Sequence, residues 1–396
     1  MEKLKIYAKT IEQEALNQIN QMNECEAYKD CVIRIMPDCH AGAGCTIGTV
    51  IAVKDRVVPN TVGVDIGCGM LVIQLGNIDV DLEKLDSVIN EHIPSGFNIR
   101  KTPYIDFSRL DFLNCLSVVD KDMALRSLGT LGGGNHFIEV DVDEANNKYL
   151  VIHSGSRNLG VRVCNYYQNK AVEYCSGKGA AYQPMIDQLK AEGRQREIPE
   201  VIKKYRQPRV PKELCYLEDD LFYSYFEDMR ICQEYARVNR ACIANVILES
   251  MGWPNGAWFE TVHNYIDVEQ NILRKGAVSA QAGQKLIIPM NMRDGSLICT
   301  GKGTIDWLYS APHGAGRLMS RSKAKEVLSM GDFVKSMEGI YTTSVCKETI
   351  DEAPMVYKPT QEIIECIKDT VEIDCIIKPI YNFKAKEQEN KFKKRV

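Results

Sequence analysis

Histidine is the residue type whose distribution in this sequence points most directly to chemistry. The 396-residue chain contains only six histidines, and His92 is the one in ordinary surroundings. The other five lie beside glycines or in otherwise unusual contexts: His40, His136, His153, His263 and His313. Glycine lets a ligand or a phosphate approach the backbone closely, and imidazole serves as a metal ligand or a nucleophile. The pattern predicts that several of these histidines share a functional site.

A carboxylate and a thiol stand three residues apart where an apolar strand breaks into a tight turn. Asp65 and Cys68 occur in the sequence VGVDIGCGM, residues 62–70. A three-residue separation across such a turn can direct both side chains to one point. Together with several imidazoles they would make a transition-metal site, for which ligand softness favours zinc first and manganese or iron second. The alternative is a structural turn with an inert, buried cysteine.

A predicted hairpin brings two of the histidines together. Residues 137–142 alternate between apolar and polar types, residues 143–147 form a polar turn, and residues 148–153 are apolar. Pairing Val142 with Lys148 places His136 almost opposite His153. Cross-strand neighbours have Cβ atoms about 5 Å apart, close enough to serve one metal site.

Several common catalytic motifs are absent from the sequence. It has no GxxxxGK[ST] loop, no HExxH and no Lys-x-Asp-Gly, although Met292 to Gly295 comes near the last of these. A covalent nucleotide adduct would therefore need a nucleophile other than lysine. His313 is the candidate, because Gly314 and Gly316 leave room for a phosphate and Arg317 offers charge for it.

The sequence predicts that a mixture of strands and helices, without a linker or an internal repeat, positions these residues. Strands are expected at residues 50–58 and 61–75, and a long helix at residues 219–251. Residues 165–212 are polar and partly basic, which favours a solvated helical insertion over a nucleic-acid contact surface; its cations are Lys190, Arg194, Arg196, Lys203, Lys204, Arg206 and Arg209. Residues 385–396 form a charged tail.

Composition bounds the class of protein. The 49 Lys and Arg against 53 Asp and Glu give a net charge of −4, which argues against a protein that coats nucleic acid by bulk charge. No apolar run could span a bilayer and the first residues lack a signal core, so a cytoplasmic location is expected. Fifteen cysteines without a CxxC pair predict buried, reduced thiols, among them Cys164, Cys232, Cys242 and Cys299.

Five motifs, in order, resemble the RtcB-type RNA ligases over residues 30 to 384. They are MPDCH (36–40), VGVDIGCG (62–69), LGGGNHFIE (131–139), HSGSR (153–157) and HGAGR (313–317). The resemblance implies one large α+β domain over residues 1–396, with β-sheets carrying a central metal site and helices packed outside. It also implies joining of RNA 3′-phosphate or 2′,3′-cyclic phosphate ends to 5′-hydroxyl ends, with GTP and two Mn²⁺ ions.

The resemblance moves the expected metal from zinc to manganese and assigns its ligands. Cys68 would bridge two Mn²⁺ ions, with His153 and His263 completing one site and Asp65 and His136 the other. A bridging thiolate is physically reasonable, because the metal charge keeps the thiol deprotonated.

The resemblance also assigns the nucleophile and the order of reaction. His313 would attack the α-phosphate of GTP to give a histidine–GMP adduct. The GMP would pass to an RNA 3′-phosphate, itself opened from a cyclic phosphate where necessary, and a 5′-hydroxyl would then displace it. RNA is the implied partner, together with a helper or release-factor-like protein, and no membrane.

Guanine and phosphate contacts are implied by position. Glu139 would accept from the base edge, Tyr357 would pack on guanine, and Lys384 matches a lysine near the family's C-terminus. Further candidates for the GTP pocket are Asn135, Asn264, Pro289, Met290, Ser296, Gly314, Gly316 and Arg317, and for phosphate or RNA Arg157 and Arg240. The segment from Pro289 to Ser296 departs from the family's pattern and includes the charged pair Arg293 and Asp294.

Two other functions compete with the ligase. The first is a metal-dependent phosphohydrolase that processes RNA ends without joining them, for which His313 would be unnecessary. The second is a catalytically silent RNA- or ribosome-binding relative, which the completeness of the ligand set and the nucleophile disfavours.

Overall fold

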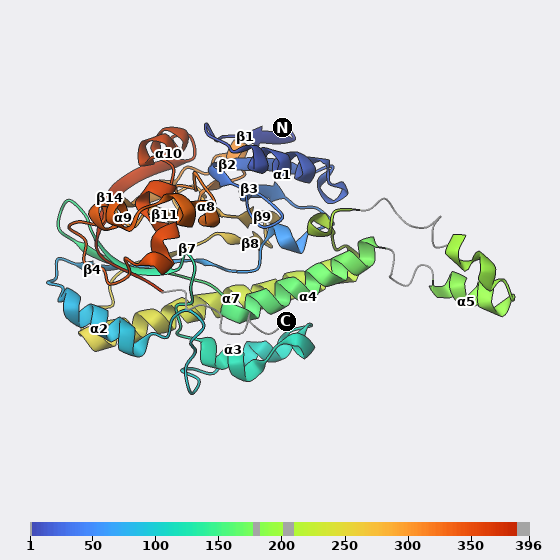
Figure 1. Ribbon diagram of the computed structural model, residues 1–396, viewed down its shortest axis with the longest axis horizontal. Coiled ribbons are helices and arrows are strands. Elements are labelled where there is room, and N and C mark those ends of the chain that lie inside the picture. The colour runs from blue at the N-terminus through green and yellow to red at the C-terminus, as the bar shows by residue number, and fades with distance from the viewer. Residues whose placement is uncertain (1, 177–182, 201–209, 386–396) are drawn as a thin grey trace.

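The computed structural model describes residues 2–176, 183–200 and 210–385, and a strongly curved seven-stranded sheet lies at its centre (Figure 1). Every neighbouring pair in this sheet is antiparallel. The edge strands β7 and β11 approach each other, and the backbone N–H of Ile287 donates to the Thr261 hydroxyl at 3.3 Å, so the sheet is a nearly closed barrel. The order is β11 (Lys285–Asn291), β12 (Gly295–Gly301), β14 (Val371–Lys384), β5 (Phe137–Val142), β6 (Lys148–Ser154), β4 (Gly69–Gly76) and β7 (Trp258–Val262).

A second sheet has five strands and is antiparallel except for its first pair. Its order is β1 (Leu4–Ile6), β2 (Val32–His40), β3 (Ile47–Ala52), β9 (Ile272–Lys275) and β8 (Asn264–Asp267). A short pair, β10 (Ala277–Ser279) and β13 (Ser310–Pro312), contacts both sheets. Chain segments that are distant in sequence therefore meet where the two sheets approach each other.

Helices cover the outside of the sheets (Figure 1). The longest is α7 (Asp219–Met251), which packs across β4 and β6. The negative charges of Asp219 and Asp220 in its first turn interact favourably with the positive end of the helix dipole. The helix ends at Gly252, which adopts the left-handed conformation at φ 68°. The other α-helices that lie within the described residues are α1 (Gln13–Glu24), α2 (Leu82–His92), α3 (Lys121–Ser127), α4 (Arg157–Cys175), α5 (Gln183–Ala191), α8 (Arg321–Val327), α9 (Met330–Ser336) and α10 (Thr360–Cys366).

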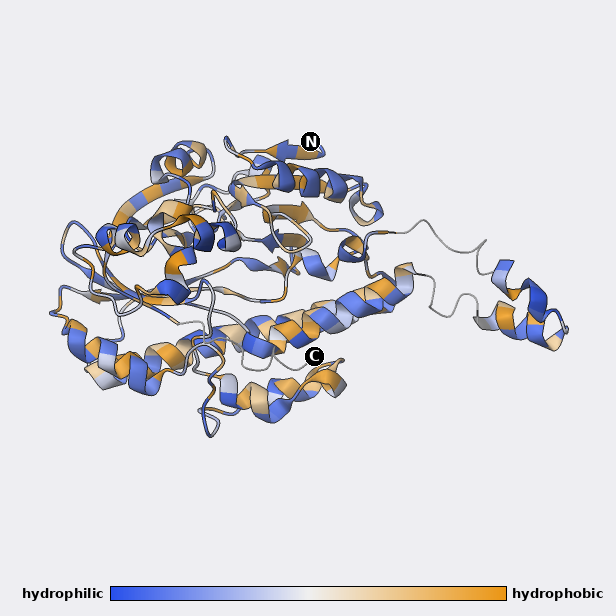
Figure 2. Ribbon diagram, in the orientation of Figure 1, coloured by the Kyte–Doolittle hydropathy of each residue, from blue (hydrophilic) through white to orange (hydrophobic). Residues whose placement is uncertain are grey.

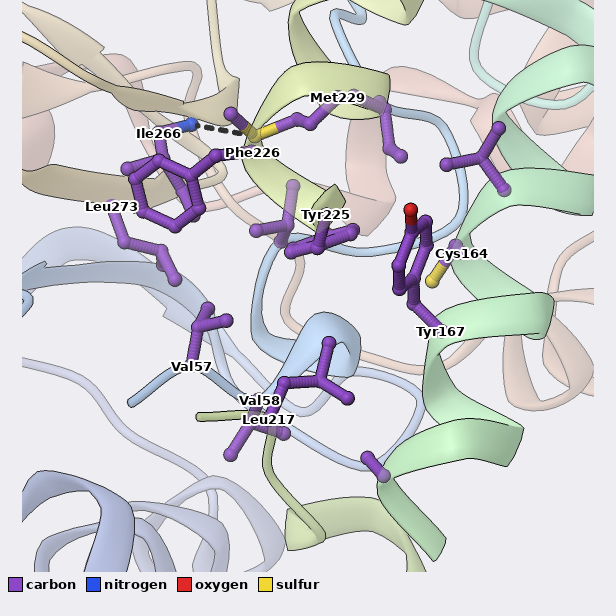
Figure 3. Packing of buried hydrophobic residues seen from close by; sticks show 14 of the residues in the cluster. Val57, Val58, Cys164, Tyr167, Leu217, Tyr225, Phe226, Met229, Ile266 and Leu273 are labelled. Atoms are coloured by element: carbon purple, nitrogen blue, oxygen red, sulfur yellow. Dashed lines mark hydrogen bonds between the residues drawn. The ribbon is translucent and has the colours of Figure 1, made fainter. Parts of the chain in front are cut away.

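The largest hydrophobic core lies between α4, α7 and the five-stranded sheet. Figure 2 shows hydrophobic residues recurring as bands along both helices. In Figure 3, Tyr167 of α4 faces Tyr225 of α7, and their ring centroids are 5.1 Å apart. A second core joins α2 and α7 to one face of β4, β5 and β6. The long helix thus ties the barrel to the five-stranded sheet.

Much of the sequence-based prediction is confirmed. The helix at 219–251, the hairpin with its Val142–Lys148 pairing, and the α+β class all agree with the structure. All fifteen cysteines fall within the described ranges and are free thiols, and most are buried. No helix among the described residues is long and apolar enough to cross a membrane.

Three predicted boundaries are wrong. Strand β3 ends at Ala52, and β4 begins only at Gly69. Between them Pro59 opens a 3₁₀ turn, and glycines 63 and 67 adopt positive φ angles that no strand allows. Residues 165–175 belong to the core helix α4, which buries Tyr167, so the insertion starts later than expected. Lys203, Lys204, Arg206, Arg209 and residues 386–396 lie outside the described residues.

We expect Ile247→Ala to lower the free energy of unfolding by about 2–5 kcal/mol, because it leaves a cavity between α7 and the barrel. Glu249→Ala, an exposed substitution on the same helix, should change it by no more than about 0.5 kcal/mol. Urea denaturation of both variants beside the wild type measures the difference. Equal effects would contradict the packing role of this helix face.

Candidate active site

The site forms where the carboxyl-terminal end of β6, the turn before β4 and the link between β7 and β8 meet. Gly67, at φ 75°, lets the turn of residues 65–68 fold back so that Asp65 and Cys68 face the same side. The backbone N–H of Gly67 donates to the carbonyl of Asn264 at 2.7 Å, and that of His263 donates to the carbonyl of Cys68 at 2.9 Å. Backbone hydrogen bonds therefore lock the Cys68 turn onto the histidine-bearing link.

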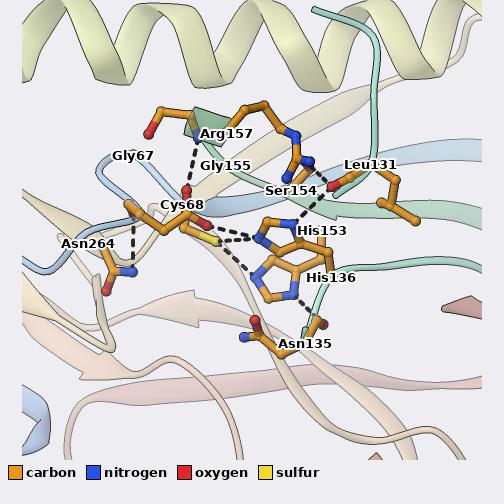
Figure 4. A network of polar contacts seen from close by, with 12 residues as sticks. Gly67, Cys68, Leu131, Asn135, His136, His153, Ser154, Gly155, Arg157 and Asn264 are labelled. Atoms are coloured by element: carbon orange, nitrogen blue, oxygen red, sulfur yellow. Dashed lines mark hydrogen bonds and ion pairs between the residues drawn. The ribbon is translucent and has the colours of Figure 1, made fainter. Parts of the chain in front are cut away.

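Four side chains converge on the sulfur of Cys68, as Figure 4 shows in part. The Nε2 atoms of His136 and His153 lie 3.4 and 3.3 Å from Sγ. His136 Nε2 is also 2.9 Å from Asp65 Oδ2, and His153 Nε2 is 3.3 Å from His263 Nε2. Two triplets have ligand atoms within 4.8 Å of one another: Cys68, His153 and His263, and Asp65, Cys68 and His136.

The hydrogen bonds of the rings decide which nitrogens face this cluster. His136 donates from Nδ1 to the carbonyl of Leu131 at 2.9 Å, and His153 from Nδ1 to the carbonyl of Asn135 at 3.2 Å. A carbonyl only accepts, so both Nδ1 atoms carry the proton and both Nε2 atoms present lone pairs in the neutral rings. Lone pairs, a carboxylate and a thiol brought this close require either protons or a cation between them. The donor set fits divalent metal ions.

The pKa values follow from burial in this cluster. Burial lowers the pKa of His153 and His263 well below the usual range, so both rings are neutral. Burial and the Asp65 carboxylate raise the pKa of the Cys68 thiol. Burial opposes ionisation of Asp65, but when His136 is protonated on both nitrogens its hydrogen bond and charge lower the pKa of Asp65 to about 2. A bound cation would supply the charge that Cys68 needs to become a thiolate.

His313 follows β13 and is oriented by Asp38 of β2. His313 donates from Nδ1 to Asp38 Oδ2 at 2.7 Å, and its backbone N–H donates to the same oxygen at 3.1 Å. The Nε2 lone pair of His313 is therefore free, in a ring whose centroid is 4.9 Å from that of His263. Sequence reasoning missed Asp38 as a functional residue, although it stands in the quoted MPDCH motif.

Gly316 allows the segment that follows β13 to lie directly against β2. It adopts φ 75°, and a Cβ at this position would lie 2.1 Å from the carbonyl oxygen of Asp38. Any larger residue would push the segment that carries His313 away from Asp38. The glycine predicted to make room for a phosphate also makes room for the backbone of β2.

A cavity of about 690 Å³ opens in front of the cluster and His313. The sequence-predicted residues on its lining are Asp65, Cys68, Asn135, Glu139, His153, His263, Asn264, Pro289, Met290, His313, Gly314, Gly316, Arg317, Tyr357 and Lys384. Asn264 also has a structural task, since it donates from Nδ2 to the carbonyl of Asp65 at 3.3 Å and accepts from the N–H of Gly276 at 3.0 Å. The cavity joins the cluster to the predicted nucleotide residues.

Glu352 organises the cations at the far side of the cavity and was missed by sequence reasoning. Its carboxylate accepts from Lys384 Nζ at 3.1 Å, Arg317 Nη1 at 3.3 Å and the Tyr357 hydroxyl at 2.7 Å, and it pairs with Arg321 at 2.6 Å. Burial opposes its ionisation, but the charges of Lys384, Arg321 and Arg317 lower the pKa of Glu352 to about 2. Its cationic partners come from two other segments, residues 317–321 and Lys384, so nothing local in the sequence marks it.

Glu139 lies on the barrel face of β5 with a second carboxyl beneath it. Asn382 of β14 donates from Nδ2 to Glu139, and burial raises the pKa of Glu139 to about 7. Asp141, two residues further along the same face, has both carboxyl oxygens buried without a hydrogen-bond partner among the described residues, and burial raises its pKa as well. Glu139 and the buried Asp141 therefore carry less negative charge than two ionised carboxylates would.

Three predicted contacts are not on the cavity wall. Ser296 is fully buried on β12, opposite Pro289. Arg157 donates to the carbonyl of Gly96 at 3.1 Å and the hydroxyl of Thr130 at 3.2 Å. Arg240 is fully buried on α7, so the prediction that it contacts RNA is wrong.

Arg240 instead supports the site from behind. It donates from Nη1 to the carbonyls of Gly67 at 2.9 Å and Ser154 at 2.7 Å, and from Nε to Glu260 at 2.7 Å. These bonds tie the Cys68 turn to the end of β6, where His153 lies. A single helix residue thereby fixes the separation between two of the predicted metal-ligating segments.

The lowered pKa of Glu352 makes a stability prediction with a definite sign. A depressed carboxyl pKa stabilises the fold in full above its ordinary value of 4.5, and the stabilisation is lost as the pH falls toward 2. We expect Glu352→Gln to lose about 3 kcal/mol at pH 7 and progressively less below pH 4.5. Urea unfolding between pH 3 and 7 measures this, with the exposed Glu249→Gln as the matched control. A deficit independent of pH would contradict the argument.

Comparison with known proteins extends over most of the chain. The family described as tRNA-splicing ligase RtcB matches residues 18–118 and 109–385. An RNA-splicing ligase RtcB of Escherichia coli (strain K12) is 31% identical over 86% of this chain and 87% of its own length. A tRNA-splicing ligase RtcB of Aeropyrum pernix is 26% identical over 84% of this chain and 83% of its own length.

Proposed function

This chain belongs to the RtcB family, and from that premise we propose that it is an RNA ligase that uses GTP and Mn²⁺ to join a 3′-phosphate or 2′,3′-cyclic phosphate end to a 5′-hydroxyl end. The observation that carries the proposal is His313, whose Nδ1 is held by Asp38 and whose Nε2 is free beside the Cys68 cluster. That arrangement suits a nucleophile that must act next to divalent cations.

The nucleophile needs no base to activate it. With its proton fixed on Nδ1 by the Asp38 carboxylate, neutral His313 presents the Nε2 lone pair to the α-phosphate of GTP. Attack forms an N–P bond, breaks the bond to the bridging oxygen and releases pyrophosphate. Asp38 then stabilises the positive charge that develops on the ring, as a carboxylate does in a catalytic triad. The product is a histidine–GMP adduct.

The Cys68 cluster is the proposed metal site. Asp65, Cys68 and His136 would hold one ion and Cys68, His153 and His263 the other, so Cys68 would bridge the two. When bound, such ions neutralise phosphoryl charge and orient the groups for in-line displacement. Arg240 and the carbonyls of Leu131 and Asn135 keep the ligands aimed at this point.

The rest of the cavity is proposed to take the nucleotide. Glu139 would accept from the donor edge of guanine, and Tyr357 and Lys384 lie on the same cavity wall. Arg317 and the backbone around Gly314 and Gly316 lie next to His313, where the phosphates must be for attack. Pro289 and Met290 form an apolar part of the wall, and Asn135 offers an amide beside the cluster.

The later steps of the proposed reaction take place in the same cavity. The GMP passes from His313 to the RNA 3′-phosphate, with a cyclic phosphate opened first to a 3′-phosphate. A 5′-hydroxyl then attacks that phosphorus and releases GMP. A metal-dependent phosphohydrolase in which metal-activated water attacks the phosphate needs no histidine nucleophile, so the Asp38–His313 pair favours the ligase over end processing alone.

Incubation with α-³²P-GTP and Mn²⁺ tests the adduct. We expect an acid-labile label on the wild type and none on His313→Ala, because the substitution removes the imidazole whose Nδ1 is held by Asp38 and whose free Nε2 would attack GTP. His92→Ala, which alters an exposed histidine outside the cavity, should label like the wild type. Failure to label the metal-loaded wild type would overturn the GTP-dependent mechanism and promote the phosphohydrolase.

Metal stoichiometry tests the bridging thiolate. The wild type should bind two Mn²⁺ ions per chain, whereas Cys68→Ala should lose both and His136→Ala and His263→Ala should each lose one. Equilibrium dialysis with metal analysis gives the count, with His92→Ala as the control. Two ions retained by Cys68→Ala would contradict a bridge.

A further inference from the structure

One imidazole in the cavity has no part in the chemistry described so far. All six histidines lie among the described residues; three are assigned to the metal cluster, His313 is the nucleophile, and His92 is exposed outside the cavity. His40, at the end of β2, lines the cavity together with His313 and Arg317. It is the remaining imidazole on the lining of the cavity where RNA ends would meet.

The orientation of His40 is set by the residue that orients the nucleophile. His40 donates from Nδ1 to the backbone carbonyl of Asp38 at 2.9 Å, while the side chain of Asp38 accepts from His313. Because a carbonyl cannot donate, the neutral ring of His40 carries its proton on Nδ1 and an unshared pair on Nε2. Asp38 therefore fixes two rings in the same tautomer, one through its carboxylate and one through its backbone.

The two residues that follow His40 also line the cavity, and helix α1 holds them in place. Glu12 accepts from the N–H of Ala41 at 2.8 Å, and Gln18 accepts from that of Gly42 at 3.1 Å. The strand end that carries His40 is thereby fixed against the same cavity as the nucleophile His313.

The proton balance of the proposed reaction leaves a task for such a base. Attack by neutral His313 and attack by a phosphate oxygen release no proton from the nucleophile. The joining step is different, because a 5′-hydroxyl must lose its proton as it attacks. General-base assistance of this kind contributes about 10²- to 10⁴-fold in rate.

We infer that His40 is the general base of the joining step, an inference that rests on the proposed ligase function. As the O5′–P bond forms and the bond from that phosphorus to GMP breaks, the proton of the 5′-hydroxyl passes to His40 Nε2 and then to solvent. GMP leaves with the electron pair of the broken bond. His40 takes no part in forming the histidine–GMP adduct.

The electrostatics of the ring agree with this task. Burial lowers the pKa of His40 to about 4, with the charges of His313 and Arg317 acting in the same direction and Asp38 in the opposite one. The ring is therefore unprotonated at neutral pH and ready to accept. The negative charge of bound RNA phosphates raises the basicity of the ring when the substrate is in place.

His40→Asn is the decisive variant, because the asparagine amide can still donate to the Asp38 carbonyl but offers no basic nitrogen in place of Nε2. The substrates are an RNA with a preformed guanylylated 3′-phosphate and a 5′-hydroxyl RNA, mixed with the Mn²⁺-loaded protein in a single turnover. We expect joining to fall by about 100-fold or more. Labelling by α-³²P-GTP should stay within about threefold of the wild type, and His92→Asn should match the wild type in both assays.

A second measurement separates a base from a structural residue. The wild-type joining rate should fall at acidic pH as His40 is protonated, and His40→Asn should lack this limb; added imidazole should restore joining to His40→Gly. Joining at the wild-type rate by His40→Asn overturns the inference, as does an equal loss of labelling and joining, which would mean that His40 only supports Asp38. Absence of label on the wild type is the separate failure of the proposed function.

Discussion

The structure depends on a concentration of unshared electron pairs around the sulfur of Cys68. Two imidazole nitrogens lie within 3.4 Å of that sulfur, and a third faces one of them at 3.3 Å. These electron pairs repel one another unless protons or cations lie between them. The surrounding fold holds these side chains together. The carbonyls of Leu131 and Asn135 fix the tautomers of His136 and His153. Gly67 reverses the chain beside Cys68, and Arg240 hydrogen-bonds to the carbonyl of Gly67.

The two ends of the cavity differ in charge. At one end, neutral rings, a carboxylate and a thiol form a donor set that fits metal cations; at the other, Lys384, Arg317 and Arg321 gather around the carboxylate of Glu352. His313 lies between these ends, where a triphosphate would have cations on both sides. Glu352 keeps the basic side chains in fixed positions without the mutual repulsion that three free cations would produce.

Asp38 orients two residues that act in different steps of the proposed reaction. Its carboxylate orients the nucleophile and its carbonyl orients His40, so both rings respond to the position of one strand end. Gly316 lets the His313 segment lie directly on that strand. The pairing of β10 and β13, which contacts both sheets, thus brings together residues that no single element could present.

Local patterns were sufficient to predict several elements. Three- and four-residue spacing predicted α7 over its whole length, and the alternation around a polar turn predicted the β5–β6 register and hence the approach of His136 to His153. The turn that carries Asp65 and Cys68 was predicted from three residues of spacing and its glycines. These features depend on neighbours within a few positions, for which periodicity and turn geometry are strong constraints.

Other features arise only when the sheets pack. Asp38 and His313 are 275 residues apart, and Glu352 draws its cationic partners from distant segments. Arg240, a candidate for phosphate or RNA contacts on sequence, is buried by α7 against the barrel. The sequence by itself determined which residues could ligate, attack and turn. The tertiary structure decided which nitrogen of each ring faces the cavity and which charges meet there, because hydrogen bonds and burial across distant segments set tautomers and pKa values.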